Sequence, residues 1–241
     1  MALRGVSLGS KTIEYVLELG LVVLGISASF WIENYREALG EHRQEQVYLQ
    51  GLHQDLVRDS AALVAYIGVQ QRRAAACGHL LAAPDLAYLS SDSARTDVYH
   101  IAANERFVRH TNTLREMEGS GQFRLLRDSA TRQQLLELDN LHEALTRSQD
   151  HQRYDLYEHL YPAFFRGLDF PVLLKRPEQR TTLEAQRFGK ELQTALRTDR
   201  VLTNVLAVVA YNAANTEGFT ATLEATTRLL RRIEGQLKKA R

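Results

Sequence analysis

The feature that most constrains this fold is an apolar stretch near the N-terminus, the twenty residues from Ile13 to Ile32. At about 1.5 Å per residue, a helix of this length covers roughly 30 Å, the thickness of the hydrocarbon core of a bilayer. A helix also satisfies its own backbone hydrogen bonds, which lipid cannot do. The stretch therefore predicts one transmembrane helix, and the lipid bilayer is the first expected partner.

Aromatic side chains flank this stretch, with Tyr15 near its start and Trp31 and Tyr35 near its end. Such aromatic belts are typical of a span that is not cleaved. A cleaved signal peptide is the alternative, because basic residues precede the apolar run and small residues lie near its end. We favour an N-terminal arm and anchor over residues 1–35, followed by an extramembrane domain over residues 36–241.

The charged residues are balanced and dispersed, with 30 Lys and Arg against 29 Asp and Glu. Because there is no long basic block, nucleic acid is not an expected partner. Cys77 is the single cysteine, which rules out a disulfide within the chain. Four prolines in 241 residues, together with helical spacing of apolar residues, favour an all-α class.

The region after the apolar stretch predicts a helical bundle. Residues 33–71 contain no proline and repeat apolar side chains at nearly heptad spacing, at Leu49, Leu52, Leu56, Leu63 and Tyr66. The transmembrane helix should therefore continue without a break into a long helix. Further helices are expected from the capping cluster Ser90-Ser91-Asp92-Ser93 to about residue 117, then over 129–161, 181–197 and 199–238. A turn is expected at 118–122 and an ordered loop over 162–180, and the apolar run 201–210 predicts a buried core helix.

One narrow stripe of the apolar stretch carries Glu14, Glu18, Gly25 and Ser29 on a helical wheel drawn at about 100° per residue. An acid at the bilayer centre costs at least about 2.5 kcal/mol, and lipid offers it no partner. Gly25 and Ser29 have the spacing of small residues that lets two helices approach closely. The stripe therefore predicts a homo-oligomer that assembles through this face.

Two other roles for the acidic residues stay open. Glu14 and Glu18 lie in the first two turns of the expected span, where they can extend toward the headgroups and do nothing more. Copies of both residues from several chains could instead line a pathway for ions or protons. The protein would then be a small homo-oligomeric channel or a proton-coupled transport accessory.

A second group, His151, Asp155 and His159, is spaced i, i+4, i+8 on one face of an expected helix. Imidazole and carboxylate at this spacing can bind a metal ion. No further ligands stand out, so polar surface or interface residues are the favoured interpretation, and no metal or cofactor is expected. Ser120 lies between two glycines, a pattern more typical of a turn than of a nucleophile. An enzyme is therefore not expected.

Four segments in a fixed order carry a family resemblance: YVLELGLVVLGI at 15–26, WIEN at 31–34, YLQGLHQDL at 48–56 and TLREMEGSGQFRLL at 113–126. In these the chain resembles bacterial single-span membrane proteins grouped as domain of unknown function 6090. That family typically has a Gly-Glu pair at the start of the span and an Asn-Asn-Trp-Asn-Glu exit. The chain keeps Glu18 and Gly25 but has Leu17 before the glutamate and an altered exit.

The family has no assigned activity, so the resemblance implies a bacterial membrane topology and a helical domain but no catalytic residues. Acidic residues follow the end of the span, which favours a cytoplasmic N-terminus and a periplasmic domain in the bacterial inner membrane. We expect a non-enzymatic interaction or sensing module that is anchored in the membrane and binds a protein partner still to be identified.

Overall fold

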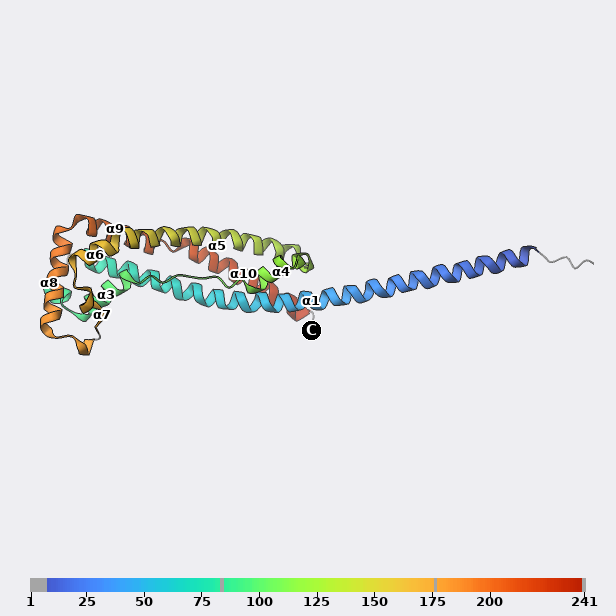
Figure 1. Cartoon of the computed structure of the whole chain (residues 1–241), viewed down its shortest axis with the longest axis horizontal. Coiled ribbons are helices and arrows are strands. Elements are labelled where there is room, and N and C mark those ends of the chain that lie inside the picture. Colours follow the sequence, from blue (N-terminus) through green and yellow to red (C-terminus); the bar gives the residue numbers. More distant parts are fainter. Residues whose placement is uncertain (1–7, 83–84, 176, 240–241) are drawn as a thin grey trace, which may run out of the picture.

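The computed structural model describes residues 8–82, 85–175 and 177–239. Within these ranges every regular element is helical and none is a strand, which confirms the expected all-α class. Figure 1 shows an elongated helical bundle from which one long helix projects.

Helix α1 (Leu8–Leu81) runs for 74 residues, which confirms the expected continuous helix. Its side chains from Leu17 to Gly40 are all exposed, and the first buried side chain is that of Glu45. Beyond this point the apolar stripe faces the bundle. Its five predicted members, Leu49, Leu52, Leu56, Leu63 and Tyr66, are no more than 5% exposed, as expected.

The other elements fold back along the C-terminal half of α1. They are α2 (Leu86–Leu89), α3 (Asp92–Ala102), α4 (Asn112–Gly119), the 3-10 turn η1 (Gln122–Leu125), α5 (Ser129–Asp155), the π-helical turn η2 (Leu156–Leu160), α6 (Tyr161–Gly167), α7 (Phe170–Leu174), the 3-10 turn η3 (Pro177–Gln179), α8 (Thr182–Thr198), α9 (Arg200–Ala214) and α10 (Glu217–Lys239). Helices α9 and α10 pack along α1, α5 packs on α10, and α8 lies across the end farthest from the projecting helix (Figure 1).

Two large apolar clusters and one small cluster form the core. The cluster nearest the projecting helix joins α1, α4, α5 and α10, and includes Leu49, Met117, Leu138 and Ile233. The cluster at the far end joins α1, α3, α6, α8 and α9, and includes Leu80, Ile101, Phe164, Phe188 and Leu206. A small cluster joins Leu63, Tyr66, Leu145 and Phe219 of α1, α5 and α10 to Phe107, which lies between α3 and α4.

The expected helix from the serines to residue 117 is wrong in its second half. Ser91 caps α3, as its cluster predicts, but α3 ends at Ala102 and the next helix begins only at Asn112. Between these helices, backbone N–H groups donate hydrogen bonds to buried side chains of other helices. The N–H of Phe107 donates to Gln149 Oε1 at 2.8 Å. Asp59 bonds the N–H of His110, also at 2.8 Å. These tertiary hydrogen bonds replace the helical ones.

The expected loop over 162–180 is wrong in part, because it contains α6 and α7. Pro171 stands at the second residue of α7, where the missing N–H costs no hydrogen bond. Pro162 is the second residue of α6, directly after the π-helical turn η2, so the helical run from α5 continues past residue 161. The expected single helix over 199–238 is also divided, at Asn215 and Thr216, into α9 and α10.

The turn predicted at 118–122 is confirmed, and Gly121 adopts the left-handed conformation with φ of 67°. The apolar run in α9 is buried on one face only. Leu202, Leu206 and Val209 are in the core, whereas Val201 and Val208 are about half exposed.

Candidate functional site

The expected transmembrane face lies on the part of α1 that projects from the bundle. Glu18, Gly25 and Ser29 are exposed on it, whereas the side chain of Glu14 lies outside the described residues. The Ser29 hydroxyl donates a hydrogen bond to the Gly25 carbonyl at 2.9 Å. Its polar atom is thus satisfied within the helix, and Gly25 has no atom within 4 Å of the position that a Cβ would take. This face is free to receive a second helix.

Among the described residues, α1 is the one helix long and apolar enough to cross a membrane. None of its apolar segment is buried within the bundle. A soluble protein would leave a row of large apolar side chains in water, including Leu21, Leu24, Phe30 and Trp31. The arrangement is therefore consistent with a single membrane span.

The candidate metal residues form a pair rather than a triad. His151 Nε2 lies 3.8 Å from Asp155 Oδ2, which also accepts a hydrogen bond from Asn212 at 3.1 Å. The π-helical turn η2 starts after Asp155 and changes the helical repeat, and the exposed ring of His159 packs edge-on against Tyr154. In the described part of the chain, no group of three or more His, Cys, Asp or Glu side chains is placed to hold a metal ion.

A buried polar cluster that the sequence analysis missed lies at the same π turn. Arg73 is 3% exposed, and its guanidinium donates to the backbone carbonyls of His100 and Ala103. Gln70 donates to the Tyr66 hydroxyl at 2.6 Å and accepts from Arg73 at 3.4 Å. Burial lowers the pKa of Arg73, because a charged guanidinium is costly without water.

A small cavity lies between Arg73 and Asp155 and is also lined by Gln152 and Asn212. Its volume is about 10 Å³, which is close to the space that one water molecule needs. It is too small for a metabolite. The cluster therefore links α1, α5 and α9 through polar contacts and fixes how the three helices fit together.

Two further carboxylates of α1 hold the start of α4 and the extended segment that precedes it. Asp55 accepts a hydrogen bond from the backbone N–H of Thr113 at 3.0 Å, and Asp59 accepts from both the N–H and the ring of His110. Burial raises the pKa of Asp59, although its hydrogen bonds to His110 oppose the change. Both carboxylates therefore have a structural task.

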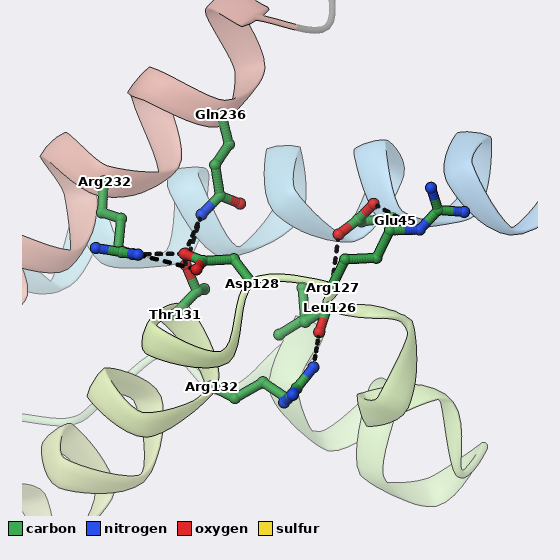
Figure 2. A network of polar contacts seen from close by, with 8 residues as sticks. All are labelled: Glu45, Leu126, Arg127, Asp128, Thr131, Arg132, Arg232 and Gln236. Atoms are coloured by element: carbon green, nitrogen blue, oxygen red, sulfur yellow. Dashed lines mark hydrogen bonds and ion pairs between the residues drawn. The ribbon is translucent and has the colours of Figure 1, made fainter.

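A third carboxylate, Glu45, joins α1 to the loop that follows η1, at the end of the bundle nearest the projecting helix. Its side chain accepts from the backbone N–H of Arg127 at 2.7 Å and lies 3.7 Å from the Arg127 guanidinium (Figure 2). The same guanidinium donates a hydrogen bond to the Ala38 carbonyl at 3.2 Å, seven residues before Glu45 in the chain. Contacts between α1 and the rest of the bundle therefore begin at Ala38.

Asp128 ties the start of α5 to the end of α10. Its carboxylate accepts from Arg232, from Gln236 at 2.7 Å and from Thr131 at 2.7 Å (Figure 2). The hydrogen bonds to Arg232 hold the pKa of Asp128 well below its usual range. These contacts close the bundle at the end from which α1 projects.

A large groove with a volume of about 900 Å³ lies at the opposite end of the bundle. Side chains of α8, with Arg166 and Gly167 at the end of α6, form most of its wall; Figure 1 shows where these two helices lie. Its lining mixes both signs of charge with one large exposed apolar side chain, that of Leu183. Such a lining is typical of a surface that contacts another protein rather than of a closed site for a small molecule.

No protein-family model, curated protein or solved structure matches this chain.

Proposed function

We propose that this protein is a non-enzymatic interaction or sensing module that α1 anchors in a bacterial inner membrane. The continuity of α1 carries the proposal, because one helix is both the apolar segment and the central helix of the bundle. The bundle is therefore fixed to the anchor without a flexible linker. Its large groove lies at the end farthest from the anchor, in reach of a protein partner. We place the N-terminus in the cytoplasm and the bundle in the periplasm.

Self-association through the Gly25 face is the first part to test. Replacing Gly25 with leucine is expected to turn a crosslinked oligomer in native membranes into a mostly monomeric species, because the added side chain separates the two backbones. Gly20 gives a matched control, since it lies about 140° around the same helix and also has open space around it. Gly20→Leu should leave the oligomer intact. An oligomer that survives Gly25→Leu would remove this interface.

The exposed carboxylate of Glu18 supports one alternative function, that of a channel or proton-coupled transport accessory. It shares the apolar helix with Gly25, and no ion pair within the described residues neutralises it. Replacing Glu18 with glutamine removes the charge at nearly constant volume. If the reconstituted wild type conducts ions and Glu18→Gln falls to background while its assembly is unchanged, the alternative is favoured. If the protein is an interaction module, either neither protein conducts or the substitution leaves the conductance unchanged.

A further inference from the structure

The end of the bundle from which α1 projects lies close to the level that the membrane surface would take. Arg127 reaches the carbonyl of Ala38, which is three residues beyond Tyr35 and seven beyond Trp31. At about 1.5 Å per residue, the Arg127 guanidinium is therefore about 10 Å above Trp31 along α1. A Trp in an aromatic belt lies at the headgroup level, and the headgroup layer is roughly 5 to 8 Å thick. Arg127 is thus placed at the outer edge of the headgroups.

Arg127 also lies on the same side of α1 as the interfacial aromatic residues. Ala38 and Glu45, the two residues of α1 that Arg127 contacts, fall within about 40° of Trp31 on a helical wheel. Tyr35 stacks on Trp31 with ring centroids 5.9 Å apart, so it belongs to the same side. The turn η1 and its arginines therefore overhang the aromatic side of the helix.

Two exposed arginines give this overhang a local positive charge. Arg124 is exposed in η1 and makes no ion pair or hydrogen bond among the described residues, and Arg127 is only partly neutralised by Glu45. The acidic residues of the same part of α1, namely Glu33, Glu37 and Glu41, fall on another side of the helix, about 60° to 140° away from Ala38. Glu33 and Glu37 thus point away from η1, whereas Glu41 lies only about 40° from Glu45 on the wheel and Glu118 is exposed at the end of α4, just before η1.

Helix α10 adds positive charge at the same end of the bundle. Lys238 lines a groove with Gln46 and Gln50 of α1. The basic end of α10 therefore lies one to two helical turns farther from the projecting part of α1 than the η1 contacts do. Lys239 follows it and is exposed.

From these positions we propose that Arg124 and Arg127 bind the phosphate groups of anionic phospholipids in the leaflet where α1 leaves the membrane. The inference rests on the proposed anchoring. Trp31 and Tyr35 would contact the lipid on the side of the hydrocarbon core, and the η1 turn would contact its headgroup on the side of the bundle. Headgroup binding would fix the orientation of the bundle relative to the membrane, since α1 and η1 then both contact the surface.

The test uses the full chain in nanodiscs of phosphatidylcholine, with and without added phosphatidylglycerol. Hydrogen exchange of the backbone amides in residues 119–127 reports contact of the turn with lipid. An arginine near an anionic surface contributes about 1 kcal/mol, so the protection of these amides by phosphatidylglycerol should fall by about fivefold in Arg124→Gln. Arg124 makes no contact that the fold needs, so this variant should remain folded. Arg197→Gln is the matched control, because Arg197 is exposed in α8 at the far end of the bundle.

The single tryptophan separates failure of this inference from failure of the anchoring. Quenching of Trp31 fluorescence by brominated acyl chains reports insertion of α1 and should be equal in all three proteins. Two results would overturn lipid binding by η1 and leave the anchor in place. In the first, Trp31 is quenched but phosphatidylglycerol does not change the exchange of residues 119–127. In the second, Arg197→Gln loses as much of this protection as Arg124→Gln does. Absence of quenching in the wild type would overturn the anchor and this inference together.

Discussion

Lowering the pH from neutral to about 4 is expected to remove about 3 kcal/mol of stability through His142 alone. Its ring is 6% exposed, stacks on Phe107 and has no hydrogen-bond partner at either nitrogen. Burial, with a smaller contribution from Arg109, lowers the pKa of His142 from 6.5 to about 4, and Asp139 opposes the change only weakly. The unfolded chain therefore binds a proton between pH 6.5 and 4 that the folded chain does not.

The sign follows from this difference in protons. His142 contributes no loss of stability above pH 6.5, and the loss grows as the pH falls toward 4. His142→Phe removes the titration and keeps an aromatic ring beside Phe107. The free energy of unfolding from urea titrations in detergent, measured at several pH values, should fall more steeply in the wild type than in this variant. Parallel curves for the two proteins would show that His142 is not the group responsible.

Replacing Gly189 with alanine is expected to destabilise the bundle by about 2 kcal/mol. A Cβ at this position in α8 would lie 2.8 Å from the backbone nitrogen of Ser90 and 2.9 Å from the carbonyl carbon of Leu89. Both are backbone atoms, so no rotamer change can relieve the contact. The close approach of α8 to the end of α2 therefore requires a glycine.

Gly235 provides the opposite result from the same substitution. It lies in α10, it is exposed, and a Cβ added there would have no atom within 4 Å. Gly235→Ala should raise the free energy of unfolding by roughly 0.5 to 1 kcal/mol, because alanine loses less conformational entropy in a helix. Urea unfolding followed by circular dichroism measures both variants. A Gly189→Ala protein as stable as Gly235→Ala would contradict the close helix contact.

The part of the fold that depends on local pattern could be predicted from the sequence. Leu49, Leu52 and Leu56 define the buried side of α1 through spacing alone, and Gly121 marks the turn before α5. The extended segment between α3 and α4 could not be predicted in this way. It contains no proline or glycine, and its conformation depends on Asp59 and Gln149, which are distant in sequence.

The buried polar residues of α1 could have been found from the sequence, if polar as well as apolar residues had been counted at the heptad positions. The stripe of α1 that begins at Leu49 continues with alternating steps of three and four residues, and its polar members are Asp59, Gln70 and Arg73. All three are no more than 3% exposed. A polar residue at a stripe position is expected to be buried and hydrogen-bonded, but the sequence does not say by which partner.

The pairing of α1 with α10 affects how the protein is made. Leu229 and Ile233 of α10 share an apolar cluster with Leu49 and Leu52 of α1, although α10 is synthesised long after α1. Under the proposed topology, α1 therefore enters the membrane while its apolar stripe is still uncovered, and the bundle is completed at the membrane surface only after α10 has left the ribosome. A nascent chain arrested before α10 would be tethered but open, and so a ready substrate for chaperones and proteases.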